Sequence, residues 1–422
     1  MKIAFYTLGC KVNQYETQSL RELFTNKGHT VVSHRSDFDC IILNSCTVTA
    51  ESDRKARQLL NRFRRENPEA LIVLTGCMAQ VLKDTSNINA DIIIGNTDLS
   101  QIVDLVEKGE KTVQINPHER KACFNTPTIS DFAERTRAYL KIEDGCERYC
   151  SYCMIPYARG FVRSKAIEDI KTEALNLSLK GFKEIVLVGI NLSAYGKGEE
   201  INLCDAVDAV CGTTGIERVR LGSLEPDHIS DEMLTRFSLQ EKFCPQFHLS
   251  LQSGSDSVLK RMNRHYDSAF YEDLVNRIRK IFPDSSISTD IMVGFPKETE
   301  KEFKESLAFA KKIGFAKTHV FAYSRREGTV ADKMDGQIPN EVKSKRSREM
   351  IEATLKSEAD FIGSLVGKTV EVLFETEENG KWTGYTKNYA HVEVISSENL
   401  GGKLKNVKIL SSVGETALGE LV

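Results

Sequence analysis

Three closely spaced cysteines stand near the middle of the chain, at Cys146, Cys150 and Cys153. Cysteine thiolates bind iron–sulfur clusters, and four of them complete the ligand shell of a cubane. A set of three leaves one iron open to another ligand, so such a site can be catalytic as well as electron-transferring. The alternative is a zinc site, because Cys150 and Cys153 form a pair of the kind with which many zinc sites begin. The odd third thiol and the missing second pair weigh against zinc.

A second set of three cysteines, Cys10, Cys46 and Cys77, is spread over the first part of the chain, and each follows an apolar run. The carboxyl ends of neighbouring strands lie side by side in an open parallel sheet, so we expect these thiols to converge. The alternative is three unrelated small residues in turns, since free cysteine is commonly buried. The remaining cysteines are predicted to be packing residues: Cys40, Cys123, Cys204, Cys211 and Cys244.

The elements that must position the second set are predicted from periodicity. Strands are expected at 2–8, 40–44 and 70–75, and helices at 14–27 and 51–65. In the first helix Leu20, Leu23 and Phe24 recur at helical spacing, which gives it an apolar face that can cover a sheet. Residues 1–105 are therefore predicted to form an open parallel α/β domain.

The rest of the chain divides into a linker and two further domains. The sequence becomes polar and aperiodic over 106–136, which predicts the linker. Strands expected at 138–143, 184–190, 218–221, 247–251, 286–293 and 318–323 then predict a partial (β/α)6 barrel over 137–356. The central cysteines follow the first of these strands, where reactive groups of such barrels lie. Short β-type runs punctuated by glycines predict a small all-β barrel over 357–422, so the fold class is α/β with an all-β carboxyl-terminal domain.

The spacing of the central cysteines matches a Cys-x3-Cys-x2-Cys loop, and here the chain resembles the radical S-adenosylmethionine superfamily. The resemblance implies that the open iron binds S-adenosylmethionine and that a donated electron splits this cofactor into a 5′-deoxyadenosyl radical. It also implies that cofactor-binding groups lie in the cysteine loop and at the strand ends, at Tyr152, Gly189, Asn191, Ser223, Glu225, Gln252 and Asp290. The alternative is that several of these residues only cap strands or helices.

The two cysteine sets together resemble the methylthiotransferase family, which combines an amino-terminal cluster domain, a radical S-adenosylmethionine barrel and a small β-barrel of the TRAM type. The resemblance extends to the segments 155–160 (IPYARG), 249–255 (LSLQSGS) and 294–299 (GFPKET), although Lys297 stands where the family usually has glycine. It implies two 4Fe-4S clusters, one held by Cys10, Cys46 and Cys77 and the other by Cys146, Cys150 and Cys153. The first would carry the sulfur group to be inserted, and the second would generate the radical.

The segment 9–16 (GCKVNQYE) resembles the branch that methylthiolates N6-threonylcarbamoyladenosine next to the tRNA anticodon. This resemblance implies a tRNA anticodon stem-loop and S-adenosylmethionine as partners, together with an electron donor and a sulfur source of unspecified identity. Three alternatives stay open: isopentenyladenosine in tRNA, an aspartate of a ribosomal protein, and a non-enzymatic, metal-bound RNA-binding protein.

The composition limits how the protein can bind RNA and where it is expected to reside. The 57 basic and 60 acidic residues nearly cancel, so any RNA contact must use local basic faces. One candidate face carries Arg54, Arg57, Arg62, Arg64 and Arg65, and another carries Lys343, Lys345, Arg346 and Arg348. In the last barrel, Trp382 and Tyr385 are either base-stacking aromatics or core residues. No signal peptide or membrane span is predicted, so we expect a cytoplasmic protein without a membrane partner, in which 11 cysteines serve metal binding or catalysis rather than disulfides.

Overall fold

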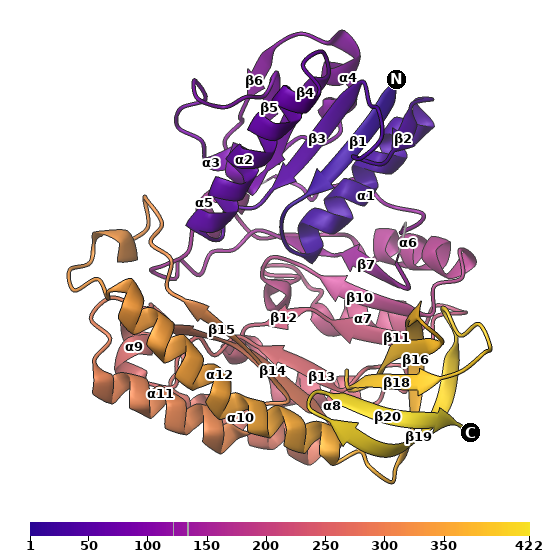
Figure 1. Ribbon diagram of the computed structural model, residues 1–422, viewed down its shortest axis with the longest axis vertical. Coiled ribbons are helices and arrows are strands. Elements are labelled where there is room, and N and C mark those ends of the chain that lie inside the picture. The colour runs from indigo at the N-terminus through magenta and orange to yellow at the C-terminus, as the bar shows by residue number, and fades with distance from the viewer. Residues whose placement is uncertain (121, 133–134) are drawn as a thin grey trace.

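The computed structural model describes residues 1–120, 122–132 and 135–422. Three bodies are visible in Figure 1: an indigo sheet domain at the top, a pink to orange half-barrel below it, and a small yellow barrel beside the half-barrel. The predicted fold class is confirmed by this arrangement. Within the described residues, no helix combines the length and the apolar character needed to cross a membrane.

The first body is a six-stranded parallel sheet with the order β2-β1-β3-β4-β5-β6. Its strands are β1 (Lys2–Thr7), β2 (Thr30–Val32), β3 (Cys40–Ser45), β4 (Leu71–Gly76), β5 (Ile92–Ile94) and β6 (Thr112–Gln114). Its helices are α1 (Lys11–Asn26), α2 (Ala50–Glu66), α3 (Cys77–Val81) and α4 (Gln101–Lys108). Side chains alternate across each strand, so Ile41 and Leu43 pack with α2 while Ile42 packs with α1 and α4 on the other face.

The second body is a half-barrel built from two parallel sheets, β11-β10-β7 and β12-β13-β14-β15. A bridge between Val219 and Phe243 joins the two sheets. The strands are β7 (Arg137–Lys141), β10 (Glu184–Val188), β11 (Arg218–Leu221), β12 (Ser223–Leu224), β13 (Gln246–Leu249), β14 (Ser286–Val293) and β15 (Lys317–Ala322). The outer helices are α6 (Ile167–Leu179), α7 (Leu203–Cys211), α8 (Asp231–Ser238), α9 (Asp256–Arg261), α10 (Ser268–Ile281) and α11 (Glu300–Ile313). Strands and helices share one continuous apolar core.

The third body is a closed five-stranded barrel with the order β16-β17-β18-β20-β19. Its strands are β16 (Thr369–Glu378), β17 (Lys381–Thr386), β18 (His391–Ile395), β19 (Leu404–Val413) and β20 (Thr416–Leu421). The long helix α12 (Asn340–Gly363) packs along β15 and connects the half-barrel to this closed barrel, as Figure 1 shows. The boundary expected between residues 356 and 357 falls inside this helix.

The segment 106–136, expected to be a linker, contains the end of α4 and all of β6, so the first sheet continues past residue 105. Residues 121, 133 and 134 of this segment lie outside the described residues. Another local feature is Lys297, which has a φ of 64° and so occupies the left-handed region that favours glycine. The departure from the family pattern at Lys297 therefore falls at a position where glycine would be unstrained.

We expect the turn before Cys77 to require glycine. Gly76 has a φ of 91°, and a Cβ there would lie 2.5 Å from the carbonyl oxygen of Ser45. Gly28 has a similar φ of 85° but nothing within 4 Å of the corresponding Cβ. Gly28→Ala should therefore lower the free energy of unfolding by only about 1–2 kcal/mol, the cost of the left-handed backbone, whereas Gly76→Ala should cost more. Denaturant unfolding of both variants measures this, and equal losses would contradict the steric argument.

Candidate active site

The central cysteine loop is held in one shape by its backbone. It lies between β8 (Glu143–Asp144) and α5 (Ile155–Arg159), and β9 (Arg163–Ser164) pairs with β8. Gly145 has a φ of 97°, and a Cβ there would lie 1.9 Å from the carbonyl oxygen of Phe161. The amide of Cys146 donates to the carbonyl of Gly160 at 2.9 Å, and the amide of Cys153 donates to that of Cys150 at 2.9 Å. These bonds bring the three thiols onto one face of the loop, close enough to affect one another's ionisation.

A buried arginine faces this loop from the neighbouring part of the half-barrel. Nη1 of Arg264 lies 3.2 Å from Sγ of Cys150, and its Nη2 lies 2.5 Å from Oε2 of Glu225. Burial raises the pKa of the Cys146 thiol to about 12, so a free thiol there is protonated at neutral pH. A cationic partner favours the thiolate form that iron requires. Arg264 therefore places positive charge where thiolate ligands would need it.

The second set of cysteines lies at one edge of the first sheet. Cys10 precedes α1, Cys46 follows β3, and Cys77 is the first residue of α3 after β4. Burial raises the pKa of Cys77 to about 12, and the nearby Cys46 and Cys10 add to this rise. The structure thus brings together three thiols that are separated by tens of residues in the sequence.

A buried ion network joins the two cysteine sets. Arg159 of α5 is fully buried; its Nε lies 3.1 Å from Sγ of Cys77, and its Nη2 lies 3.0 Å from Oε2 of Glu16 on α1. Nζ of Lys141 lies 2.8 Å both from Oε1 of Glu16 and from Oδ2 of Asp144. Burial alone would raise the pKa of Glu16, but Arg159 and Lys141 lower it, so the carboxylate stays charged. One end of α5 therefore lies beside the second cysteine set, while the other end follows the central loop.

Two buried acceptor atoms beside the central loop have no hydrogen-bond partner among the described residues: Oε1 of Glu143 and Oδ1 of Asn191. The other carboxylate oxygen of Glu143 accepts from the amide of Asn191 at 2.7 Å. A Cβ at Gly189 would lie 2.5 Å from that same oxygen, so only glycine leaves space beside the Glu143 carboxyl group. Unsatisfied buried acceptors are costly, and a ligand that carries amino or hydroxyl donors fits them. This donor requirement suits the amino and ribose groups of S-adenosylmethionine.

The other predicted cofactor residues lie in different settings. Ser223 and Asp290 line a large cavity, and Glu225 pairs with Arg264. Gln252 has a φ of 69°, and its amide donates to the carbonyl of Asp290 at 2.8 Å. Tyr152 packs against a small apolar cluster. Gly189, Asn191 and Glu225 therefore lie directly beside Glu143 or Arg264, and Tyr152 lies near Arg264 and the central cysteines.

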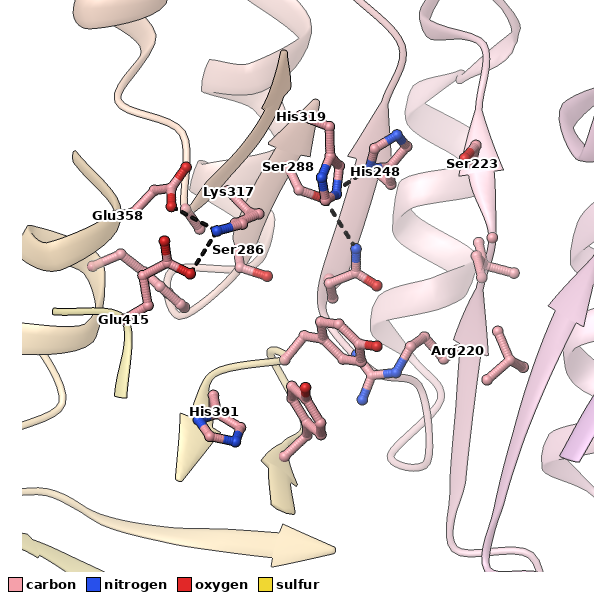
Figure 2. A pocket seen from close by; sticks show the side chains of 18 of the residues that line it. Arg220, Ser223, His248, Ser286, Ser288, Lys317, His319, Glu358, His391 and Glu415 are labelled. Atoms are coloured by element: carbon pink, nitrogen blue, oxygen red, sulfur yellow. Dashed lines mark hydrogen bonds and ion pairs between the residues drawn. The ribbon is translucent and has the colours of Figure 1, made fainter. Parts of the chain in front are cut away.

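The cavity has a volume of about 690 Å³ and is bounded by the half-barrel, α12 and the last barrel. Figure 2 shows His248, Ser288 and His319 on the half-barrel strands, facing His391 of the last barrel. Tyr385 and Tyr389 stack on each other with ring centroids 4.6 Å apart, and Arg137 lies over both rings. Lys11, the residue after Cys10, also lines this space, so the cavity extends to the chain neighbour of the second cysteine set.

Within the described part of the chain, no group of three or more His, Cys, Asp or Glu side chains lies in an arrangement suited to a single metal ion. Three thiols with adjacent cationic side chains instead suit a larger inorganic cluster, in which each thiolate binds a different iron. Cys123, predicted to be a packing residue, is exposed, so that prediction was wrong; the other four unassigned cysteines are buried.

Part of each predicted basic face is used in ion pairs or packing, while Arg57, Lys345 and Arg348 remain exposed. On α2, Arg54 pairs with Glu51 and Arg64 pairs with Asp91. Lys343 is buried and donates to the carbonyl of Tyr323, while Arg346 is buried against Glu298. The second proposed face is therefore wrong for these two residues, because they pack inward against the half-barrel.

Sequence reasoning missed Glu143, Arg159 and Arg264. Glu143 stands directly before Asp144-Gly145-Cys146, and an acidic pair between a strand and a cysteine loop was a usable signal. Arg159 ends the segment IPYAR, where a charged residue in an otherwise apolar stretch indicates a buried ion pair. Arg264 lies far from the cysteine loop in the sequence, and no spacing pattern connects the two.

Two family profiles match the chain over these same regions. The one described as the Radical SAM superfamily matches residues 140–310, and the one described as Uncharacterized protein family UPF0004 matches residues 2–95. The radical S-adenosylmethionine methyltransferase TsrM of Kitasatospora setae has a similar fold, with a TM-score of 0.58 over 78% of this chain and 76% of that chain, at 12% identity. The fold and the cysteine loop thus define a radical S-adenosylmethionine enzyme.

Full-length relatives define the family more narrowly. Threonylcarbamoyladenosine tRNA methylthiotransferase MtaB of Bacillus subtilis is 35% identical over 97% of this chain and 94% of the relative. The protein of the same name from Aquifex aeolicus is 39% identical over 97% of this chain and 100% of the relative. The tRNA-2-methylthio-N(6)-dimethylallyladenosine synthase of Clostridium perfringens is 34% identical over 99% and 96%. The chain belongs to the methylthiotransferase family of radical S-adenosylmethionine enzymes. Its cofactors are S-adenosylmethionine and 4Fe-4S clusters.

We expect the buried network to hold the two cysteine regions together. Arg159→Met should lower the free energy of unfolding by about 3–5 kcal/mol, because it leaves the buried carboxylates of Glu16 and Asp144 without one of their cations. Adding Glu16→Gln should recover part of this loss, since it removes one of the stranded charges.

The matched control is Arg54→Met, which removes an exposed arginine that also pairs with a glutamate and should change stability little. Denaturant unfolding of the four proteins measures the effect. An Arg159→Met variant as stable as Arg54→Met would show that the network contributes nothing to the fold.

Proposed function

We propose that the protein replaces the hydrogen on C2 of N6-threonylcarbamoyladenosine, next to the anticodon of tRNA, with a methylthio group. The observation that carries the proposal is a buried ion network between the two cysteine triads, in which Arg159 contacts Cys77 and pairs with Asp144, two residues before Cys146. A cavity of about 690 Å³ lies between the half-barrel, α12 and the last barrel. Relatives that carry the name of this activity match the chain over nearly its whole length. Family membership excludes the non-enzymatic alternative.

The two triads have separate tasks in this proposal. Cys146, Cys150 and Cys153 hold the cluster that binds S-adenosylmethionine, with Glu143 and Asn191 offering acceptors to the cofactor's donors. The triad of Cys10, Cys46 and Cys77 holds the second cluster. When bound, these cofactors supply a radical that removes the C2 hydrogen and a sulfur group that takes its place.

The protein's own residues position and shield the reaction. The Arg159–Glu16 network fixes the distance between the two triads, because both of its ends are buried and charged. Arg264 holds Glu225 and Cys150 together beside the central loop. Cys46, Cys77 and Cys150 are buried, which limits the access of water and stray reductant to these thiols, whereas Cys10 is exposed.

In this proposal the first body, including β6, is a cluster domain, the half-barrel is the radical core, and the closed barrel of β16–β20 is of the TRAM type. A tRNA substrate and reduced thiols suit a cytoplasmic location. Isopentenyladenosine is the leading competing substrate, because relatives at 34% identity are named for dimethylallyladenosine. The charged lining of the cavity favours the more polar substituent of threonylcarbamoyladenosine.

The proposed reaction is tested with anaerobically purified, cluster-reconstituted protein, reductant, a sulfur source and S-adenosylmethionine. One reaction receives tRNA that bears N6-threonylcarbamoyladenosine and another receives tRNA that bears isopentenyladenosine. Nucleoside mass spectrometry should show a gain of one methylthio group on the first substrate only. A gain on isopentenyladenosine alone would redirect the assignment to the other tRNA branch.

The division of labour between the triads is tested with the variant in which Cys10, Cys46 and Cys77 are all replaced by alanine. We expect it to lose methylthio insertion and the iron of one cluster, yet still form 5′-deoxyadenosine, because the central triad is intact. Cys123→Ala is the matched control, since Cys123 is exposed and belongs to neither triad. Loss of 5′-deoxyadenosine formation in a folded triple variant would show that the roles are assigned incorrectly.

A further inference from the structure

One cation that lines the cavity has no anionic partner. Lys11 stands directly after Cys10, at the first position of α1, and its exposed side chain borders the cavity of about 690 Å³. Across residues 1–120, 122–132 and 135–422, its ammonium group makes no ion pair or hydrogen bond. Lys11 is thus a donor that faces the cavity and is free to bind a ligand.

The other cations of the cavity are already neutralised by carboxylates. Nε of Arg137 lies 2.6 Å from Oε1 of Glu375, and Nε of Arg220 lies 2.7 Å from Oε1 of Glu184. Figure 2 shows Lys317 between two carboxylates, with its Nζ 2.9 Å from Glu358 and 2.5 Å from Glu415. The pairs of Arg137 and Lys317 hold the last barrel and α12 against the half-barrel, and the pair of Arg220 joins two strands of the half-barrel. The charges of these three cations are therefore used by the fold.

The surroundings of Lys11 make an unpaired ammonium unfavourable. The guanidinium groups of Arg137 and Arg220 line the same cavity as Lys11. An ammonium group that shares a cavity with other cations is stabilised by an anion that enters the same space. Lys11 therefore has the setting of a ligand-binding cation rather than that of a surface lysine.

We propose that Lys11 binds the carboxylate of the N6-threonylcarbamoyl substituent and so determines which modified adenosine the enzyme accepts. This inference rests on the proposed function. The threonyl carboxylate is an anion that unmodified adenosine and isopentenyladenosine both lack. A charge-assisted hydrogen bond to this carboxylate strengthens binding of the threonylcarbamoyl substrate. Binding of isopentenyladenosine is weaker, because it leaves the lysine unpaired.

The chemistry of adenine agrees with the position of Lys11. Carbons C2 and C6 flank N1 on the same ring, so the atom to be modified and the N6 substituent lie close together. Cys10 belongs to the triad assigned to the sulfur-carrying cluster, and Lys11 is its neighbour in the chain. A base that presents C2 to that cluster therefore presents its N6 substituent to the region of Lys11.

The rest of the lining suits the remaining groups of the substituent. Hydroxyl groups of Ser223, Ser286 and Ser288 and the imidazole of His319 border the cavity (Figure 2) and can hydrogen-bond with carbamoyl and hydroxyl groups. The cavity volume lies within the range of about 300–1,000 Å³ that is usual for small-ligand pockets, so a modified nucleoside fits.

An anion for Lys11 can come from other sources of similar chemistry, namely an RNA phosphate or the carboxylate of S-adenosylmethionine.

The test uses cluster-containing protein without reductant, so that binding is measured and no turnover occurs. Fluorescence anisotropy reports the affinity for one anticodon stem-loop prepared in three forms: with N6-threonylcarbamoyladenosine, with its threonyl methyl ester, and with unmodified adenosine. The proteins compared are the wild type, Lys11→Gln, Lys11→Arg and the control Lys27→Gln, which alters an exposed lysine at the other end of α1.

We expect the wild type and Lys27→Gln to bind the free carboxylate form about 10- to 100-fold more tightly than the methyl ester. Lys11→Gln should lose this preference, and Lys11→Arg should keep most of it. Equal weakening of all three RNAs by Lys11→Gln would identify a phosphate contact and overturn the proposal. A Lys11→Gln variant that binds S-adenosylmethionine more weakly but keeps its affinity for all three RNAs would also overturn the proposal.

The outcome is separable from that of the proposed function. Wild-type protein that binds the ester as tightly as the carboxylate would overturn the inference about Lys11 even if methylthio insertion is observed. Wild-type protein that prefers the carboxylate, with the preference lost in Lys11→Gln, would support Lys11 as a recognition residue even if no methylthio group is inserted. In that case the insertion assay alone would reject the proposed function.

Discussion

The structure depends on one buried cation that two separate domains share. Arg159 lies at the end of the short helix that follows the central cysteine loop, and it contacts both Glu16 of the first domain and the thiol of Cys77. A buried guanidinium is tolerated only where its charge and its donors are met, so the first domain and the half-barrel must keep this arrangement. Lys165 adds a parallel link, since its Nζ lies 2.9 Å from the hydroxyl of Tyr15 while the same lysine pairs with Glu173. Two reactive clusters whose separation matters are in this way held by charge pairs that water does not weaken.

The last barrel is built into the site as well. Nη2 of Arg218 donates to the carbonyl of Glu371 at 2.8 Å, and Nη1 of Arg220 donates to that of Lys387 at 2.9 Å. Both arginines stand on β11 of the half-barrel, so the strands that form the cavity also dock the third body. Figure 1 shows this small barrel beside the strands of the half-barrel, and Figure 2 shows His391 facing the same cavity. All three bodies therefore contribute to one binding space, which explains why relatives match the chain over nearly its whole length.

Charge in this protein is organised locally. The formal net charge is −3 at pH 7, and many basic residues on the helices pair with acidic neighbours. A broad positive field for RNA is therefore absent from the composition, and recognition must depend on a few unpaired or aromatic groups. The stacked Tyr385 and Tyr389 under Arg137 and the unpaired Lys11 are groups of that kind, and they border the cavity itself. The similar fold of the TsrM methyltransferase at 12% identity shows that the scaffold alone does not set the substrate.

The sequence by itself determined the architecture and the two cysteine triads. Strand and helix periodicity located the main elements to within a few residues, because a helix or strand must bury one face. The position of Cys146 after a strand predicts that its loop is the reactive one. The tertiary structure alone decided how these parts meet. Arg264 and Cys150 are 114 residues apart, and Arg159 and Cys77 are 82 apart, so no local pattern could pair them. It also turned Lys343 and Arg346 inward and left Lys11 facing the cavity, because which lysine or arginine finds a carboxylate depends on packing between elements that are distant in the chain.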